Sequence, residues 1–459
     1  MVLGDKSLLE DDLKSSYSKA GASHVLAVSG LHVGIIFLVL NYLFGFFLKG
    51  NLFAPRFLRS VFIVALLWGY AVLTGLSPSV LRASVMFSFL QFGFLFQRPY
   101  CVYSSIVASA FVLLLFDPHL LFDVGFQLSY AAVLSILFFQ PRISNLRLVA
   151  CVKECTFIPS RYRKIPRSLI GWSVDLTTVS LAAQIGTIPL VLYYFHQFSC
   201  LFWLSGLFVI PLAVALIYLA LSSFAVSFIP LVSSFFVSAL SFVASLTNKV
   251  VVFIGELPFA VVDWVDFRKE DVVIYYIMLF FLALFLVNRK AVHLMVGLAA
   301  ASVLLVVSSL RVCTPADTSV AVYNYAGRSA VNLYGRGFNI VCSSADSSLV
   351  CRQLKRFWIR QHTTPAVFSS SHLLEGGGVS VFIVDRDLGG MPEYGRPVSV
   401  DYLVVSADVR FPVSKLKSLF KYKQLIVDSS CSLATSYWWK KQCPSAHLVR
   451  VAGDYIEHI

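Results

Sequence analysis

The stretch VLAVSGLHVGIIFLVLNYLFGFFL, residues 25–48, contains no Asp, Glu, Lys or Arg. It is slightly longer than the roughly 20 apolar residues that a helix needs to cross the hydrocarbon core of a bilayer. Inside lipid every backbone N–H and C=O must be paired within its own element, so an apolar run of this length becomes a helix. The stretch therefore predicts a membrane-spanning helix and excludes a soluble first domain.

Similar apolar runs follow, and together they predict a polytopic α-helical membrane protein with about ten crossings. The composition agrees, because 58% of the 459 residues are hydrophobic and only 13% are charged; a soluble chain has nearly twice that charged share. We interpret residues 25–310 as the transmembrane domain and residues 1–24 as a polar segment ahead of it. The further predicted spans are 57–75, 80–97, 102–116, 121–139, 174–195, 201–228, 231–255, 272–287 and 291–310.

The basic residues between these spans predict the orientation of the chain. They gather in every second loop, at 49–59, 98, 142–167 and 289–290, whereas 256–271 is mostly acidic. Loops rich in Lys and Arg stay in the cytoplasm. Residues 1–24, 256–271 and everything after Leu310 are then predicted to lie outside, and cytoplasmic loops account for the net charge of +13.

After Leu310 the composition changes to short β-branched runs separated by helix-like stretches. Alternating strands and helices predict an α/β domain over 311–459, of about 150 residues, large enough for a core of its own. An outer location permits disulfides among Cys313, Cys342, Cys351, Cys431 and Cys443, and because five is odd at least one of them stays unpaired or bonds elsewhere. The predicted strands are 319–325, 330–334, 338–342, 379–384, 402–405, 424–427 and 448–451, and the predicted helices are 346–360, 412–421 and 432–442.

Polar side chains inside the spans are the candidate functional residues, because burying them at bilayer depth is costly. His24 and His32 are predicted to share one side of a single helix. Arg82 is the only arginine that these limits place well inside a span. The pattern suggests a polar path entered from outside, lined by His24, Ser29, His32, Arg82, Asp123, Gln127, Gln184 and Thr187.

Each candidate also has a structural interpretation. His24 fits the membrane interface, His32 fits a hydrogen bond within the bundle, and Arg82 with Asp123 fits an ion pair. Small residues four positions apart favour close helix packing, here Gly30 with Gly34 and Gly125 with Ser129. Pro189 predicts a kinked or broken helix.

Several catalytic motifs are absent. The chain has no GxxxxGK[ST], HxH, HExxH, HxxxH or GxSxG, which removes the P-loop, the common zinc-hydrolase layouts and the nucleophile elbow. No cofactor or metal is predicted. The residues by themselves leave a channel, a transporter or a membrane scaffold with an outer domain.

Four blocks then resemble the ComEC competence proteins, in the order of that family. They are Gly21–Gly34 (GASHVLAVSGLHVG), Tyr70–Met86 (YAVLTGLSPSVLRASVM), Asp117–Ala132 (DPHLLFDVGFQLSYAA) and Ala183–Pro189 (AQIGTIP). The resemblance implies a channel that carries one strand of transforming DNA across the bacterial cytoplasmic membrane. It also implies partners, namely a DNA receptor outside and a helicase-like motor inside, while a homo-oligomer stays open.

The chain departs from this family in two places. Family members carry further N-terminal spans and an OB-like domain, whereas this sequence starts near Val2–Asp5 (VLGD), as expected of a fragment, a shortened paralogue or a misplaced start. Val320–Ala330 and Asp401–Ser406 resemble strands of the metallo-β-lactamase-like domain that ends many members. Where HxHxDH should follow Ser406, the sequence reads Ala407-Asp408-Val409-Arg410.

We therefore expect a degenerate outer domain without a metal site, and no enzyme. Two alternatives to a DNA channel remain: a transporter of a small anionic solute on the same scaffold, and a membrane-anchored scaffold without transport activity.

Overall fold

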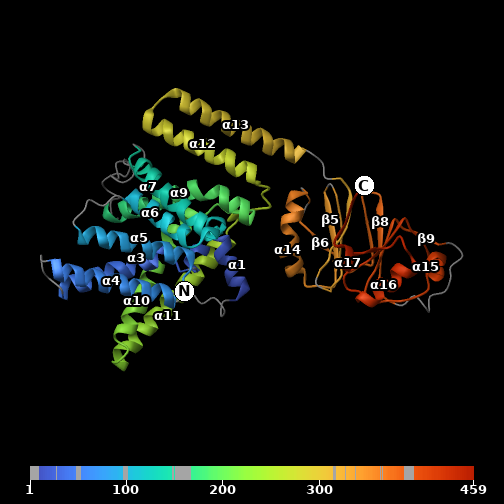
Figure 1. Cartoon of the computed structure of the whole chain (residues 1–459), viewed down its shortest axis with the longest axis horizontal. Helices are drawn as coiled ribbons and strands as arrows, with labels where there is room; N and C mark the ends of the chain where they lie inside the picture. Colours follow the sequence, from blue (N-terminus) through green and yellow to red (C-terminus); the bar gives the residue numbers. More distant parts are fainter. Residues whose placement is uncertain are drawn as a thin grey trace, which may run out of the picture. The chain divides into compact units, whose positions relative to one another are not determined.

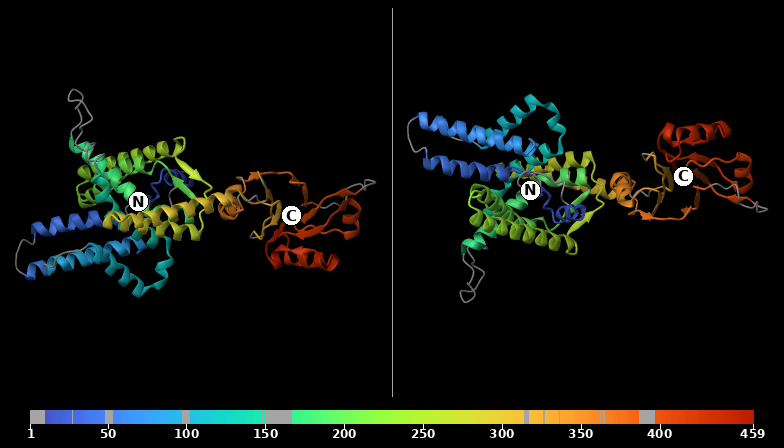
Figure 2. Two further views of the ribbon diagram at one scale, coloured as in Figure 1. Left: turned by 90° about the horizontal axis from the view of Figure 1, so that it is seen from above. Right: turned by 90° about the horizontal axis from the view of Figure 1, so that it is seen from below.

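The structure is a computed structural model, and it describes residues 10–26, 28–47, 53–96, 102–146, 149, 167–313, 317–325, 327–335, 337–361, 363, 365–386 and 397–459. The chain packs as two units, Met1–Val272 and Val273–Ile459. Figure 1 labels their elements and Figure 2 gives two further views. The first unit is helical, and the second ends in strands and short helices.

The helices follow the predicted apolar runs. They are α1 (Asp11–Lys19), α2 (Ser23–Leu26), α3 (Gly30–Phe47), α4 (Phe53–Leu73), α5 (Pro78–Leu95), α6 (Val102–Phe116), η1 (Pro118–Phe122), α7 (Val124–Ser144), α9 (Arg167–Phe195), α10 (Phe202–Ala225), α11 (Pro230–Glu256), α12 (Lys269–Asn288) and α13 (Ala291–Cys313). In the described part of the chain, eight helices are long and apolar enough to cross a membrane, while α3 and α6 are shorter apolar helices. A helical region with several candidate membrane-spanning helices, followed by an α/β domain, is thus confirmed, and the number of crossings stays a prediction.

The first predicted span is wrong at its start. The chain forms α2 up to Leu26 and then a new helix, α3, from Gly30. The carbonyl of Ser29 accepts the amides of His32 and Val33, so Ser29 caps α3. His24 and His32 therefore lie on different helices and do not share one face. The capping preference of Ser29 overrides the continuous apolar pattern.

The segment before the first span packs onto the helical bundle. Tyr17 of α1 is fully buried in a cluster with Val209 of α10 and with Val251 and Ile254 of α11. Its hydroxyl donates to Oδ1 of Asn248 on α11 at 2.9 Å. A short antiparallel pair that the sequence does not predict, β1 (Gln197–Ser199) with β2 (Val261–Asp263), joins the start of α10 to the end of α11.

Two of the glycines predicted to allow close helix packing were Gly34 and Gly125. The structure shows a close helix contact at Gly34 but not at Gly125. A Cβ on Gly34 would lie 3.3 Å from the ring of Phe87, so α3 and α5 approach here as expected. A Cβ on Gly125 would meet only the carboxylate of Asp123, its own helix cap, at 3.1 Å. The tightest contact between α7 and α9 is instead at Gly186, where a Cβ would come within 2.7 Å of the carbonyl oxygen of Ala131. Pro189 follows inside α9, which continues unbroken to Phe195.

The C-terminal part contains two five-stranded sheets. One has the order β13-β12-β10-β8-β7, parallel except for β7, and the other has the order β14-β3-β4-β5-β6. The elements are β3 (Ser319–Val322), β4 (Ala330–Gly335), β5 (Phe338–Ser343), α14 (Ser347–Arg360), β6 (Val367–Phe368), β7 (Leu373–Gly376), β8 (Val379–Val384), β9 (Val398–Ser399), β10 (Tyr402–Val405), α15 (Val413–Leu419), β11 (Phe420–Lys421), β12 (Gln424–Val427), α16 (Leu433–Gln442), β13 (His447–Leu448), α17 (Val449–Ala452) and β14 (Tyr455–His458). Strands β9 and β11 form a separate parallel pair.

These sheets and helices form four layers. Apolar side chains of β3 and β4 pack against those of β8, β10 and β12, so the two sheets lie face to face. The outer face of the parallel sheet is covered by a cluster that includes Leu416 of α15 and Trp439 of α16. Leu354 and Phe357 of α14 pack on the outer face of the other sheet. The order of layers is helix, sheet, sheet, helices.

One strand prediction for this domain is wrong, and the possible disulfides are not formed by the cysteines that the structure describes. Residues 449–452 form the helical turn α17, and only His447–Leu448 pair as a strand. Cys342, Cys351, Cys431 and Cys443 are all free, and the side chain of Cys313 lies outside the described residues. Cys431 is buried, with its thiol facing the carbonyl of Val405 at 3.6 Å, so it acts as an apolar core residue.

Candidate functional site

Arg82 is the most unusual polar residue of the helical unit. Pro78 sets the first turn of α5, since proline fits the first helical position, and Arg82 follows one turn later on the inner face. Its side chain is 6% exposed. The Nε and Nη1 atoms are buried and have no hydrogen-bond partner. A buried cation with two unsatisfied N–H donors is costly, which makes this arginine the leading functional candidate.

The surroundings of the Arg82 guanidinium involve three helices, of which α7 and α3 lie next to it while α6 holds the Tyr130 hydroxyl. Its carbon lies 5.5 Å from the centroid of the Tyr130 ring on α7, within cation–π range. The Tyr130 hydroxyl is 2.9 Å from the Ser109 hydroxyl on α6. A Cβ on Gly30, the first residue of α3, would be 3.3 Å from Nη2 of Arg82. Glycine at position 30 therefore leaves the guanidinium open toward the start of α3.

His32 and Ser29 cap the helix that faces this guanidinium. The Ser29 amide donates to Nδ1 of His32 at 3.2 Å, and the Ser29 hydroxyl lies 3.0 Å from the same nitrogen. His32 thus takes the place that Glu or Gln has in a capping box. Because Nδ1 accepts the backbone amide, the neutral ring carries its proton on Nε2. The structure places His32 as part of a helix cap, two residues after Gly30.

The other predicted path residues make separate contacts. Asp123 accepts the Phe126 amide at 2.8 Å as the cap of α7, and it forms no ion pair with Arg82. Gln127 donates to the Leu121 carbonyl at 2.8 Å and accepts from the Tyr194 hydroxyl at 3.0 Å.

On α9, the Thr187 hydroxyl donates to the Ala183 carbonyl at 3.1 Å and faces Gln184 at 3.4 Å. His24 is exposed on α2. Of the eight predicted path residues, the structure brings together Ser29 with His32, and Gln184 with Thr187. Arg82 lies beside Gly30, which was predicted only as a packing residue.

This arrangement can hold an anion. A guanidinium presents donors in a planar fork that matches phosphate and carboxylate oxygens. Backbone amides at a helix start also favour negative charge, here on the side where Gly30 meets Arg82. The Tyr130 ring adds an aromatic face. The site thus combines a cation, a helix N-terminus and a ring, which suits a phosphate carried by a larger ligand.

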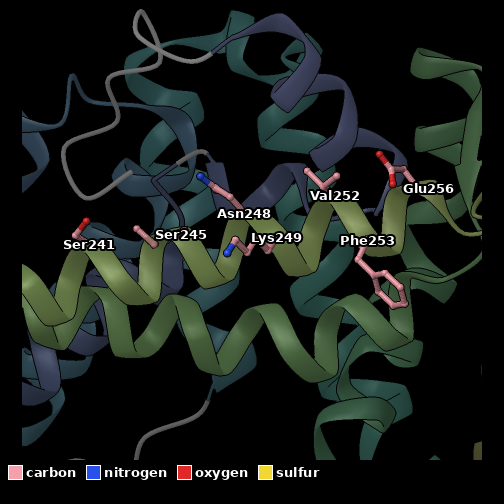
Figure 3. A pocket seen from close by; sticks show the side chains of 8 residues that line it. Ser241, Ser245, Asn248, Lys249, Val252, Phe253 and Glu256 are labelled. Atoms are coloured by element: carbon pink, nitrogen blue, oxygen red, sulfur yellow. The ribbon is translucent and has the colours of Figure 1, made fainter.

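A second polar surface follows α11. Figure 3 shows Ser241, Ser245, Asn248, Lys249 and Glu256 along one side of this helix, where they line a cavity of about 610 Å³ with Ala244, Val252 and Phe253. Ser241, Ser245, Lys249 and Glu256 are exposed. None of the eight predicted path residues lines this cavity. Sequence reasoning missed this stripe because serine is common inside apolar helices.

In the α/β domain, the loops that follow two parallel strands gather acidic side chains. Asp408 follows β10 and accepts the Ser432 amide and hydroxyl, each at 2.8 Å. Asp428 follows β12 and is fully buried, and burial raises the pKa of its carboxyl. In the described part of the chain, no group of three or more His, Cys, Asp and Glu side chains could hold a metal ion.

Sequence reasoning also missed Tyr130, Ser109 and Tyr194. Tyr130 lies one turn after Gln127 in the quoted block 117–132, and that spacing could have shown that the two share a helix face. Ser109 and Tyr194 carry no local signal, because their roles depend on contacts between helices.

Comparison with known proteins decides the family. Residues 1–290 match the model described as competence protein, and residues 320–449 match the model described as ComEC C-terminal domain. The chain belongs to the competence protein family. The blocks around Gly30, Arg82, Gln127 and Gln184 all fall inside the first match. No solved structure matches the chain.

Curated relatives align with parts of the competence protein chain. It is 35% identical over 211 residues to ComE operon protein 3 of Bacillus subtilis (strain 168), which is 46% of this chain and 24% of that protein. It is 35% identical over 133 residues to an uncharacterized protein of Aquifex aeolicus, 29% of this chain and 30% of the relative. It is 24% identical over 217 residues to the uncharacterized protein YcaI of Escherichia coli, 46% of this chain and 26% of the relative. The chain thus covers less than a third of each of these relatives.

Proposed function

We propose that this chain is a channel component for the uptake of single-stranded DNA across the bacterial cytoplasmic membrane during natural transformation. The observation that carries the proposal is the buried guanidinium of Arg82, whose Nε and Nη1 lack hydrogen-bond partners, inside a block that belongs to the competence family. A phosphodiester backbone would supply the missing acceptors one phosphate at a time. A single arginine fits a strand that must move, because one contact can form and break without trapping it.

The ring of Tyr130 supports the same ligand. Proteins that hold single-stranded nucleic acid without reading its sequence combine cationic groups for the backbone with aromatic rings for the bases. Arg82 and Tyr130 provide one of each within 5.5 Å. In this proposal Arg82 positions a phosphate beside Gly30, while the Tyr130 ring forms part of the wall.

The proposal includes an orientation and partners. The basic loop at 142–167 lies in the cytoplasm and the α/β domain lies outside, in line with the positive-inside rule. The strand arrives from a DNA receptor outside and is drawn in by a helicase-like motor inside. A homo-oligomer would enlarge a passage that one bundle makes narrow.

The outer domain is proposed to be non-catalytic and of the metallo-β-lactamase-like fold. Its four layers support the fold. The residues after Ser406 support the loss of catalysis, because Ala407-Asp408-Val409-Arg410 offers one carboxylate and no histidine. That carboxylate is already used by the Ser432 amide and hydroxyl.

The direct test measures binding of a fluorescent single-stranded oligonucleotide to the purified chain by anisotropy over a salt series. Each phosphate that a cation neutralises contributes about 0.7 to the slope of log K against log salt. We expect Arg82→Gln to weaken binding about tenfold, equivalent to roughly 1.4 kcal/mol, and to lower the slope by about 0.7. Arg82→Lys should keep the slope, because it keeps the charge.

Arg142→Gln is the matched control. Arg142 donates to the Phe138 carbonyl and stacks 3.7 Å from the Phe138 ring, at the far end of α7. It should leave affinity and slope unchanged. If Arg82→Gln accumulates normally in membranes and binds the oligonucleotide as the unaltered chain does, Arg82 is not a strand contact.

One observation favours a transporter of a small anionic solute as the second candidate. A single buried cation satisfies one small anion as well as it satisfies one phosphate of a strand. The two functions differ in whether a small anion competes with the oligonucleotide for the Arg82 site. Inorganic phosphate at millimolar concentration should displace little of the oligonucleotide from a channel, whereas a solute carrier should release it and should conduct the anion in proteoliposomes.

A further inference from the structure

A polar cavity away from Arg82 lies among α3, α4 and α5. It has a volume of about 560 Å³. Its polar lining consists of Asn41, Arg56, Arg59, Ser60 and Gln91, and its apolar lining consists of Phe37, Leu38, Leu90, Phe94 and Leu95. From the sequence we assigned Arg56 and Arg59 to a loop, but α4 begins at Phe53 and carries both in its first two turns. Two arginine side chains thus line one cavity, where their positive charge favours an anionic ligand.

The Arg59 side chain is held in place on one edge of this cavity. Its Nη2 donates to the carbonyl and to Oδ1 of Asn41, at 3.0 and 2.9 Å. A Cβ on Gly45 would lie 3.4 Å from the guanidinium, so glycine leaves room for it against α3. The Nε atom is buried without a partner. Arg59 is thus oriented by uncharged groups, and no carboxylate among the described ion pairs neutralises it.

Gln91 gives a second, independent sign of a ligand. Its side chain is 3% exposed, and Nε2 donates to the Ser60 hydroxyl at 3.1 Å. Its Oε1 atom is buried and has no partner. A buried acceptor without a donor costs free energy, so a hydroxyl from a ligand would satisfy it. The cavity is therefore complementary to a ligand with an anionic oxygen near the arginines and a hydroxyl near Gln91.

The mouth of the cavity is apolar. Leu38 is 62% exposed and Phe94 is 55% exposed, and both line the cavity on helices of the membrane domain. Arg56 is the first residue of the apolar window of α4, so the arginines lie at the depth of the lipid headgroups. Acyl chains would cover the exposed sides of Leu38 and Phe94 while a headgroup occupied the polar interior.

We propose that this cavity binds one anionic glycerophospholipid with a hydroxylated headgroup, such as phosphatidylglycerol. Arg56 and Arg59 bind the phosphodiester, and a headgroup hydroxyl donates to Oε1 of Gln91. Basic pockets between transmembrane helices on the cytoplasmic side bind anionic headgroups for this reason. A strand of DNA fits less well, because the mouth offers it two apolar side chains and no further cation. This inference does not depend on the proposed function.

The test is native mass spectrometry of the full chain, released from micelles to which phosphatidylglycerol or phosphatidylcholine is added. We expect phosphatidylglycerol to bind at least tenfold more tightly than phosphatidylcholine. Arg59→Gln should remove most of that preference, and Gln91→Leu should weaken phosphatidylglycerol binding severalfold without raising phosphatidylcholine binding. Arg142→Gln serves as control, since Arg142 lies outside this cavity and should change nothing.

Competition on the unaltered chain keeps the proposal falsifiable even if a variant fails to fold. Neither inorganic phosphate nor a single-stranded oligonucleotide should displace the bound phosphatidylglycerol. Release by phosphate would show a free-anion site, and release by the oligonucleotide would show a strand site. Equal binding of the two lipids, or equal losses in Arg59→Gln and Arg142→Gln, would overturn the lipid site.

Discussion

Two aspartates of the α/β domain show how one residue type acquires opposite roles. The Asp401 carboxylate lies 2.8 Å from Nζ of Lys423 and also accepts the Ser380 amide and hydroxyl. The hydrogen bond from Lys423 and those from Ser380 lower the pKa of Asp401. Asp428 is fully buried, with Oδ2 lacking a partner, and burial raises the pKa of its carboxyl. The fold favours the ionised form of Asp401 and the neutral form of Asp428.

The two carboxyls should therefore respond to pH with opposite signs. The contribution of Asp401 is present above its unfolded pKa of about 3.9 and is lost as pH falls through its lower folded pKa. For Asp428 the folded pKa lies above the unfolded value, so its contribution falls as pH rises from about 4. At about pH 7 we expect Asp401→Asn to destabilise the domain and Asp428→Asn to stabilise it. The Asp428→Asn difference should shrink as pH falls toward about 4, whereas the Asp401→Asn difference should shrink only below about pH 4.

Hydrogen exchange of the β10 and β12 amides in the full chain, corrected for the intrinsic rate at each pH, measures both effects. Asp401→Asn should speed exchange and Asp428→Asn should slow it. Asp346→Asn is a control, because Asp346 caps the separate helix α14 through the Ser348 amide. Equal changes in all three variants would show that the pH dependence has another source.

At the scale of elements, the sequence predicted what depends on local pattern. The apolar runs 102–116, 231–255 and 272–287 gave α6, α11 and α12 within three residues at each end. Strands β10 and β12 were also predicted at their observed limits, since buried parallel strands are continuous β-branched runs. The strands β6, β7, β9, β11 and β14 of this domain were missed, because none of these segments of two to four residues is a continuous β-branched run.

Site residues could be predicted only where the sequence alone showed that burying them in the membrane costs free energy. Arg82 stood out, because an arginine inside an apolar run is expensive wherever it points. Tyr130 did not stand out, because an aromatic residue in a span is common and its contact with Arg82 needs two helices to meet. The start of a new helix at Gly30, likewise, depends on the capping geometry of Ser29 and His32, which hydropathy does not register.

The polar side of α11 leads to a prediction about this helix. A polar stripe on a membrane-spanning helix faces water or protein, since lipid offers no hydrogen bonds. Ser241→Cys and Ser245→Cys should therefore react with a membrane-impermeant maleimide in intact cells or inverted vesicles. Phe242→Cys should not react, because Phe242 is 69% exposed on a neighbouring apolar side of the helix and is expected to face lipid.

Mass spectrometry of the α11 peptide reports each modification without interference from the nine native cysteines. Labelling of all three positions alike would show that the stripe does not define an aqueous surface.

At the scale of the whole molecule, the crossing number decides which side each loop occupies. Among the residues that the structure describes, eight helices are long enough to cross, and α3 and α6 are shorter. Either eight or ten crossings puts residues 10–24 and the α/β domain on the same side, because both numbers are even. The loop between α4 and α5, which contains Leu76, differs: it lies outside with ten crossings and in the cytoplasm with eight. The basic residues decide between them, since only ten crossings keep Lys49, Arg98 and the loop 142–167 together inside.

We therefore expect all ten helices to cross. Leu76→Cys, at a position 43% exposed, should react with an impermeant maleimide added to intact cells, and a tag after Ile459 should be reached from the same side. At about 1.5 Å per residue, the 15 residues of α6 extend only some 22 Å, so the bilayer must thin locally around this helix. Tag accessibility outside combined with Leu76→Cys labelling only in inverted vesicles would mean that α3 and α6 do not cross. In that arrangement the Arg82 end of α5 would face the cytoplasm, and a strand arriving from outside would not meet Arg82 first.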